Sequence, residues 1–180
     1  MFQRRTIIPT ALVALAALAV GSSAGNAAVQ ASSTATPRCT SGNLEVWLGL
    51  GAGGAAAGSS YYPLEFTNVS GHSCHLTGYP GVSAWGSHQL GSPAARVPSG
   101  SITPVTLRAG ATGHTLLQIT DVSNLSPASC KPARASQLKV YPPGAFHALF
   151  VPFRFRACSL AGPIFLNVAP LQPRVGVPGH

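Results

Sequence analysis

Three acidic side chains carry all the carboxylate chemistry of the chain: Glu45, Glu65 and Asp121. A serine triad would need one of them beside one of the six histidines, and two-carboxylate glycoside hydrolysis would need an acid pair. Neighbouring strands could bring only Glu45 and Glu65 together. Both glutamates occupy the polar positions of alternating segments, so we expect them to be solvated surface acids. The sequence therefore predicts no catalytic residue and favours a non-enzymatic protein.

Metal and cofactor chemistry finds equally little support. The histidines that could meet as a copper or zinc site are His75, His88, His114 and His147, and nothing in their spacing brings them together. The chain has no Cys-x-x-Cys pair that would suit structural zinc. The G-x-G-x-x-A run from Gly51 to Ala56 lacks the following helix that a dinucleotide site requires. We expect neither a metal nor a cofactor.

The four cysteines form an even set that favours disulfides. They are Cys39, Cys74, Cys130 and Cys158. Three pairings are possible in principle. The alternating segments at Leu44–Leu48 and Leu64–Thr67 predict a hairpin, and Cys39 and Cys74 bracket its Gly51–Ser60 loop almost symmetrically. Cys130 and Cys158 likewise lie equally far from Gly144. We therefore predict the bonds Cys39–Cys74 and Cys130–Cys158.

The first 28 residues predict export. Two arginines in Met1–Arg5 precede an apolar run to Val20 and a small-residue segment to Ala28, which is the layout of a secretory signal peptide. The general secretory route is favoured, and the twin-arginine route stays open. We expect a signal peptide at 1–28, a flexible leader at 29–37, one domain at 38–171 and a flexible tail at 172–180. The product would be secreted, without stable membrane insertion.

Charge is sparse and strongly basic. The chain has 11 basic and 3 acidic residues, and most basic residues of the second half follow the last acid, Asp121. Such a field favours anionic partners. Outside a cell these are acidic polysaccharides, wall polymers or lipid headgroups, and no nucleic acid is expected. The residues that we expect to form an anion-binding surface are Lys131, Arg134, Lys139, Arg154 and Arg156.

Short alternating segments between Gly and Pro predict an all-β fold with little helix. With 20 Gly and 16 Pro, we expect about nine strands in an immunoglobulin-like antiparallel β-sandwich with two disulfides; a closed barrel is the alternative. Further strands are expected at His75–Thr77, Val82–Trp85, Val105–Arg108, Thr112–Thr120, Leu138–Val140, Phe146–Phe155 and Pro163–Leu171. Val105–Leu107 and Thr112–Ile119 read as a hairpin that turns at Ala109–Ala111.

Several short sequence motifs, taken together, resemble those of a known family. The most specific one runs from Asn68 through Cys74 to Gly78-Tyr79-Pro80-Gly81-Val82, and Cys130-Lys131-Pro132 and Leu138–Pro143 follow in order. The chain resembles the actinobacterial exported domain-of-unknown-function family 4232 over about Arg38 to Leu171. The resemblance implies an exported, sandwich-like domain of the cell envelope with no assigned activity. It supplies no catalytic residues to carry over. The lipoprotein members have an anchor cysteine, which this chain lacks.

The sequence thus favours an exported binding domain for an anionic wall polymer or an extracellular protein. Two alternatives stay open. An exported hydrolase would need a cleft that gathers a histidine with one of the acids. An inhibitor of an exported protease would need a rigid, disulfide-held loop, for which Trp85–Ile102 is the candidate. Tyr79 and Trp85 would form an aromatic ligand platform only if their rings were exposed side by side.

Overall fold

A computed structural model describes residues 35–176. The predicted signal peptide and most of the predicted leader lie outside these residues, as do the last four positions. The described part is mostly β structure, as the alternating segments predict. Its one α-helix is α1 (Pro127–Cys130), and short 3-10 turns lie at η1 (Ser41–Asn43), η2 (Leu50–Ala52) and η3 (Val122–Asn124). None of the helices between residues 35 and 176 has the length and apolar character needed to cross a membrane.

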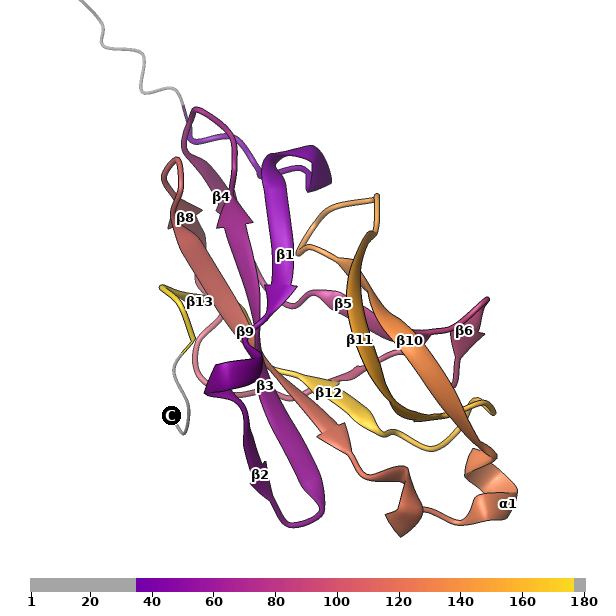
Figure 1. The fold of residues 1–180 in the computed structure, drawn as a ribbon. Helices are drawn as coiled ribbons and strands as arrows, with labels where there is room; N and C mark the ends of the chain where they lie inside the picture. The colour runs from indigo at the N-terminus through magenta and orange to yellow at the C-terminus, as the bar shows by residue number, and fades with distance from the viewer. Residues whose placement is uncertain (1–34, 177–180) are drawn as a thin grey trace, which may run out of the picture. The chain divides into compact units, whose positions relative to one another are not determined.

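The described strands form three sheets (Figure 1). The largest has the order β1-β3-β9-β12-β7, with β2 paired to β3 and β13 paired to β9; its strands are β1 (Leu44–Leu48), β2 (Gly54–Ala56), β3 (Ser59–Asn68), β7 (Ala95–Arg96), β9 (Thr112–Thr120), β12 (Leu166–Val168) and β13 (Gln172–Pro173). The second has the order β11-β10-β5-β6 and comprises β5 (Gly81–Trp85), β6 (Gln89–Leu90), β10 (Pro132–Tyr141) and β11 (Leu149–Cys158). The third pairs β4 (Cys74–Leu76) with β8 (Val105–Leu107).

One hydrophobic core joins these sheets. Leu64 and Phe66 of β3 are fully buried, and Leu138 and Val140 of β10 are buried at equivalent positions of the second sheet. Strand β1 contacts β11, and β12 contacts β5, so the two larger sheets share this core. Strands β1, β9 and β11 follow the expected period of two, which places alternate side chains on one face. The short strands β2, β6, β7 and β13 carry too little alternation to be predicted, and the sequence missed them.

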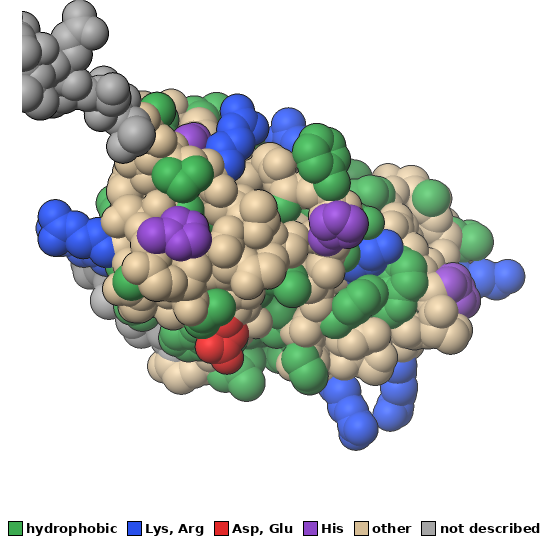
Figure 2. Space-filling model, turned by 90° about the horizontal axis from the view of Figure 1, so that it is seen from above, with side chains coloured by type: hydrophobic (Ala, Val, Ile, Leu, Met, Phe, Trp, Pro, Cys, Tyr) green, Lys and Arg blue, Asp and Glu red, His purple; other side chains and the backbone are tan. Residues whose placement is uncertain are grey.

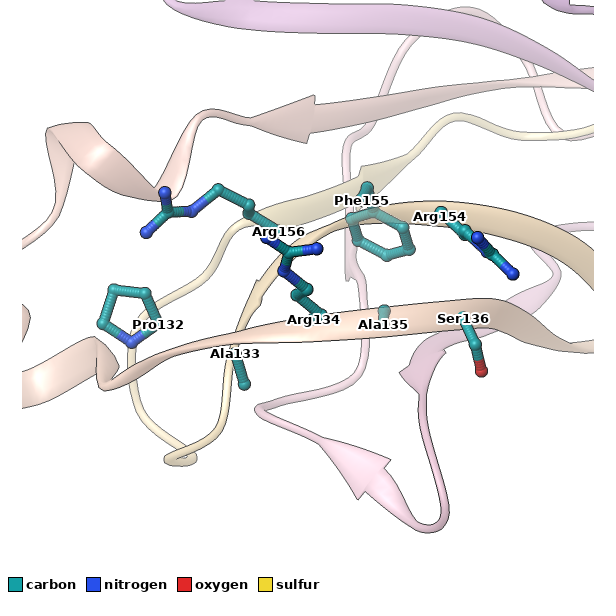
Figure 3. Close-up of a pocket in the computed structure, with 8 residues that line it drawn as sticks. All are labelled: Pro132, Ala133, Arg134, Ala135, Ser136, Arg154, Phe155 and Arg156. Atoms are coloured by element: carbon teal, nitrogen blue, oxygen red, sulfur yellow. The ribbon is translucent and has the colours of Figure 1, made fainter.

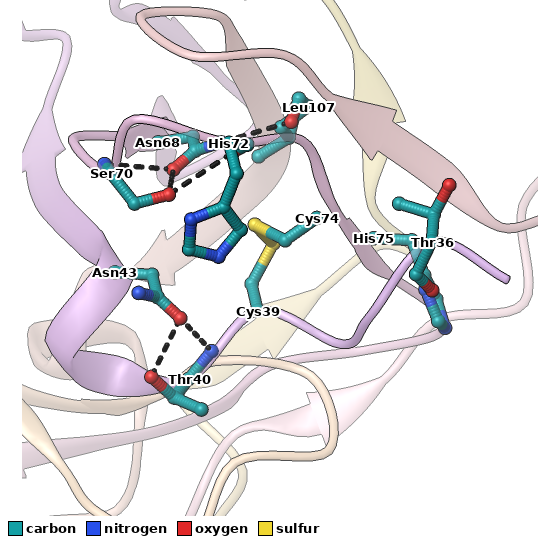
Figure 4. Close-up of a disulfide and its surroundings, with 10 residues drawn as sticks. All are labelled: Thr36, Cys39, Thr40, Asn43, Asn68, Ser70, His72, Cys74, His75 and Leu107. Atoms are coloured by element: carbon teal, nitrogen blue, oxygen red, sulfur yellow. Dashed lines mark hydrogen bonds between the residues drawn. A yellow bond between two sulfur atoms is a disulfide. The ribbon is translucent and has the colours of Figure 1, made fainter. Parts of the chain in front are cut away.

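Both predicted disulfides are confirmed: Cys39 is bonded to Cys74 and Cys130 to Cys158. Figure 4 shows the first bond beside the buried side chain of Asn68. The Asn68 amide donates to the carbonyls of His72 (2.8 Å) and Leu107 (2.9 Å), and its oxygen accepts from the backbone and hydroxyl of Ser70. These bonds fix the turn that leads to Cys74. Two disulfides are typical of an oxidising compartment outside the cytoplasm.

The predicted hairpin of Val105–Leu107 with Thr112–Ile119 is wrong. The chain does turn there, because the Ala111 N–H donates to the Arg108 carbonyl and Gly110 has φ 75°. Two hydrogen bonds also connect the turn to the end of β3: the Asn68 N–H donates to the Ala111 carbonyl, and the Gly110 N–H donates to the Asn68 carbonyl. As a result β9 pairs with β3, whereas β8 pairs with β4. The turn therefore moves the chain from one sheet to another.

The segment after Leu171, which the sequence predicts as a flexible tail, continues as a strand at Gln172–Pro173. Gln172 pairs with His114 and Pro173 pairs with Gly113, which makes β13 a neighbour of β9. The Gly176 N–H then donates to Oε1 of Glu65 at 2.9 Å. Gln172–Gly176 is thus part of the folded domain, because it pairs with β9 and donates a hydrogen bond to the side chain of Glu65 on β3.

Candidate functional site: a cationic groove on one hairpin

A groove of about 670 Å³ runs over the hairpin of β10 and β11 (Figure 3). Its lining residues are Pro132, Ala133, Arg134, Ala135, Ser136, Arg154, Phe155 and Arg156. Three of them are arginines with exposed side chains. We call this groove the arginine groove after its three arginines, Arg134, Arg154 and Arg156. They include three of the five residues that the sequence predicts to bind anions.

The strand register explains how these arginines come together. Arg134 and Arg156 are direct partners on neighbouring antiparallel strands, so both side chains leave the same face. Their strand neighbours Ala135 and Ala157 are buried on the opposite face. The register shifts between Ala135 and Gln137, where one residue of β10 lies opposite two residues of β11. Such an irregularity bends the strand and increases its twist next to Arg154.

The arginine groove concentrates like charge. Two cations placed directly opposite each other on a sheet destabilise it, and neither β10 nor β11 contains an acidic residue. Asp121 caps η3 nearby; hydrogen bonds from Ser123 and the attraction of Arg156 lower its pKa. Asp121 and Arg156 also line an adjoining hollow of about 560 Å³. An anion in the groove would relieve the repulsion that the fold imposes.

The other two predicted cations lie apart from the groove lining. Lys131 is an exposed residue with φ 49° that ends α1, and its carbonyl accepts hydrogen bonds from Ser159. Lys139 lies beyond the register shift, where its ammonium is 4.3 Å from the ring centre of Trp85 and 5.3 Å from that of Tyr141. Basic side chains outnumber acidic ones on the face drawn in Figure 2. The positive character predicted from composition is therefore visible at the surface.

Aromatic rings near the cations are the features that sequence reasoning missed. Phe155 lines the groove and stacks on Phe153, with ring centres 5.4 Å apart. Trp85 meets the edge of Phe150 at 5.8 Å. Tyr79 and Trp85 do not form a ring pair among the described residues; the Tyr79 ring instead lies 5.5 Å from the guanidinium of Arg96. The alternation of Phe153 and Phe155 with arginines was the only signal in the sequence for aromatic residues beside the groove.

The predicted placement of Glu65 on a solvated surface is wrong. Its side chain is fully buried because β3 is an inner strand whose second face lies under Gln172–Gly176. Among the described residues Oε2 has no hydrogen-bond partner. Burial raises the pKa of this carboxyl, and the Gly176 N–H and His114 oppose that change. Glu45, in contrast, is exposed on β1 as predicted.

Glu65 and His114 are direct partners on β3 and β9, which is the kind of pair that a hydrolase would need. The pair is covered, however, and belongs to neither of the two hollows described above. His114 Nδ1 lies 2.9 Å from the carbonyl of Arg174, in the covering segment. No group of three or more His, Cys, Asp or Glu side chains suited to a metal occurs within residues 35–176. Glu65 and His114 thus both contact the covering segment.

A protease-inhibiting loop was expected to be held by a disulfide, but the candidate loop Trp85–Ile102 is held by strand pairing. Residues 85–102 include β6 and β7, and β7 pairs in parallel with β12. Neither disulfide includes a residue of this segment. Sheet pairing therefore holds the middle of this segment, while residues 97–104 are exposed.

Comparison with known proteins gives one match. A family model described as "Domain of unknown function (DUF4232)" matches residues 39–171, close to the domain bounds expected from the sequence. No curated protein and no solved structure matches the chain.

Proposed function

Because the chain belongs to the DUF4232 family, whose description assigns no activity, we propose a function from the arginine groove: binding of a polyanion outside the cytoplasm, without catalysis. One observation carries the proposal. Arg134, Arg154 and Arg156 come from two strands to line one groove, on a hairpin without a single acidic residue.

The chemistry of arginine supports a polyanion. Each guanidinium offers a planar fork of donors that matches carboxylate and phosphate oxygens, and it keeps its charge at any physiological pH. Three such groups along one groove suit a ligand with repeated negative charges better than a single small ion. The large excess of basic over acidic residues adds a field that attracts such a ligand over longer distances.

The proposal includes the setting of the domain. We place the protein outside the cell as a secreted domain, because disulfides and a signal-type N-terminal sequence point the same way. In this setting an anionic wall polymer is the partner that we favour. We also retain the immunoglobulin-like sandwich as a proposed description of the two larger sheets, supported by their shared core.

Binding to immobilised polyanions at low and high salt tests this function. Matrices would carry polygalacturonate, poly-L-glutamate or no polymer, and all buffers would share one pH. We expect salt-sensitive retention of the protein on both polymers, because released counterions and screening weaken charge pairing. The double variant Arg134→Gln/Arg154→Gln should lose most of this retention.

The control is a variant with the same change of charge away from the groove. Arg38→Gln/Arg108→Gln removes two exposed arginines that do not line the groove. It should keep most of the retention if position matters. Equal losses in the two double variants would show that net charge alone acts. Absence of salt-sensitive retention in the unmodified protein would refute the proposed function.

A further inference from the structure

An aromatic cluster lies on the second sheet beside the arginine groove. Its members are Trp85 of β5, Lys139 and Tyr141 of β10, and Phe150 of β11, named the ring cluster below. Phe150 is 48% exposed, although Phe is usually buried in a core. The Lys139 ammonium lies over the rings of Trp85 and Tyr141, which fixes a cation between aromatic surfaces.

The ring cluster and the arginine groove share one face of the sheet. Phe150 is the direct partner of Lys139, and Arg156 is the direct partner of Arg134. From Leu149 to Ala157 of β11 the odd-numbered side chains are buried or half-buried and the even-numbered ones are exposed, so Phe150, Arg154 and Arg156 all point away from the core. The six-residue step from Phe150 to Arg156 spans about 20 Å of strand. The face thus presents rings at one end and guanidinium groups at the other.

We propose that this face binds an anionic glycan, whose sugar rings pack on Phe150 and Trp85 while its acidic groups meet Lys139 and the arginine groove. The inference rests on the proposed polyanion binding and names the class of polymer. The apolar face of a pyranose ring packs well on an aromatic side chain, and ligand sites typically combine aromatic surface with a few placed polar groups. A uronate residue carries both features in one unit.

The arrangement fits a glycan better than an acidic polypeptide or a bilayer. An acidic polypeptide would use the cations but leave the exposed Phe150 ring without a matching flat surface. A peripheral membrane element buries a continuous apolar face in the headgroup boundary, whereas on this face the Lys139 ammonium lies over the rings of Trp85 and Tyr141. Rings at one end and guanidinium groups at the other, about 20 Å apart, suit a polymer long enough to reach both, in which each unit carries an apolar face and a charge.

Affinity measurements with matched probes test this inference. The probes are oligogalacturonate, poly-L-glutamate of similar charge, and vesicles of phosphatidylglycerol with phosphatidylcholine. We expect Phe150→Ser to weaken oligogalacturonate binding about tenfold, the loss typical of a contributing aromatic side chain at an interface, and to leave poly-L-glutamate binding within about twofold. Phe146→Ser is the matched control, because Phe146 is 92% exposed in the loop between β10 and β11, outside the ring cluster.

A second readout does not require the removal of a ring. In a Trp47→Phe background Trp85 is the only tryptophan, and its fluorescence should change on titration with oligogalacturonate but not with poly-L-glutamate. Equal effects of Phe150→Ser on both polymers, an unchanged Trp85 signal, or preferred binding to the vesicles would overturn the glycan assignment. If binding still depended on Arg154, the proposed polyanion function would stand. If the unmodified protein bound none of the probes, that function would fail too.

Discussion

The substitution Glu65→Gln should stabilise the protein at neutral pH and flatten the dependence of its stability on pH. Glu65 is fully buried, accepts one hydrogen bond from Gly176, and has Oε2 without a partner among the described residues. Burial raises its pKa above the ordinary value of 4.5, against the opposing effects of Gly176 and His114. A glutamine keeps the shape and an oxygen for the Gly176 N–H, but it cannot ionise.

The direction of the pH effect follows from proton linkage. Below pH 4.5 the carboxyl is protonated in the folded and unfolded states alike, so its neutral packing contributes fully to stability. Above that pH the unfolded chain loses the proton first. The free energy of unfolding therefore falls as pH rises through the raised pKa of Glu65. Around the carboxyl, His114 on β9 is a titratable neighbour and Arg174 lies in the covering segment.

The size of the effect is set by the desolvation cost of ionising a buried carboxyl whose Oε2 has no partner, a cost of about 1 to 3 kcal/mol that a glutamine never incurs. We expect Glu65→Gln to exceed the unmodified protein by this amount above pH 7 and to match it within about 0.5 kcal/mol near pH 4. For a domain of this size, this gain raises the melting temperature by about 3 to 9 °C. Glu45→Gln, at an exposed acid on β1, should change stability little at either pH.

Urea unfolding of the three proteins between pH 4 and pH 8, followed by tryptophan fluorescence, measures these differences. The reasoning is refuted if Glu65→Gln is less stable than the unmodified protein at pH 7 and the unmodified protein gains stability as pH rises. That result would mean that Glu65 is ionised and stabilised by His114 within the fold.

Three further substitutions test the framework around the candidate site. Cys39→Ala/Cys74→Ala removes the disulfide between cysteines 35 positions apart and should lower the free energy of unfolding by about 3.5 to 4 kcal/mol in urea titrations. An unchanged unfolding midpoint would show that the bond contributes nothing to stability. Asn68→Ala removes four hydrogen bonds, two of them to the carbonyls of His72 and Leu107, and should cost about 2 to 4 kcal/mol, with faster amide exchange in residues 69–73. Gly91→Ala should lower the melting temperature, because Gly91 has φ 65° and an added Cβ would lie 2.7 Å from Phe165 and 2.9 Å from the Cys158 carbonyl, whereas Gly71→Ala meets open space and should not.

Local pattern was sufficient for much of this fold. Alternating segments such as Leu44–Leu48 and Thr112–Thr120 became β1 and β9 because a period of two reports a half-buried strand directly. The disulfides were predictable because each joins two cysteines that flank one pair of antiparallel strands, over 35 and 28 residues. The cations of the candidate site were predictable from composition.

The sequence by itself determined the β class, the two disulfides and the positive charge, because each follows from residue types or from spacings along one strand or hairpin. Only the tertiary structure decided which strands became neighbours and what covered their outer faces. Glu65 is buried by Gly176, 111 positions further along the chain, and alternation within β3 carries no information about so distant a segment. Likewise the register shift in β10 and β11 decided that Arg134, Arg154 and Arg156 line one groove, because pairing between strands sets which side chains meet.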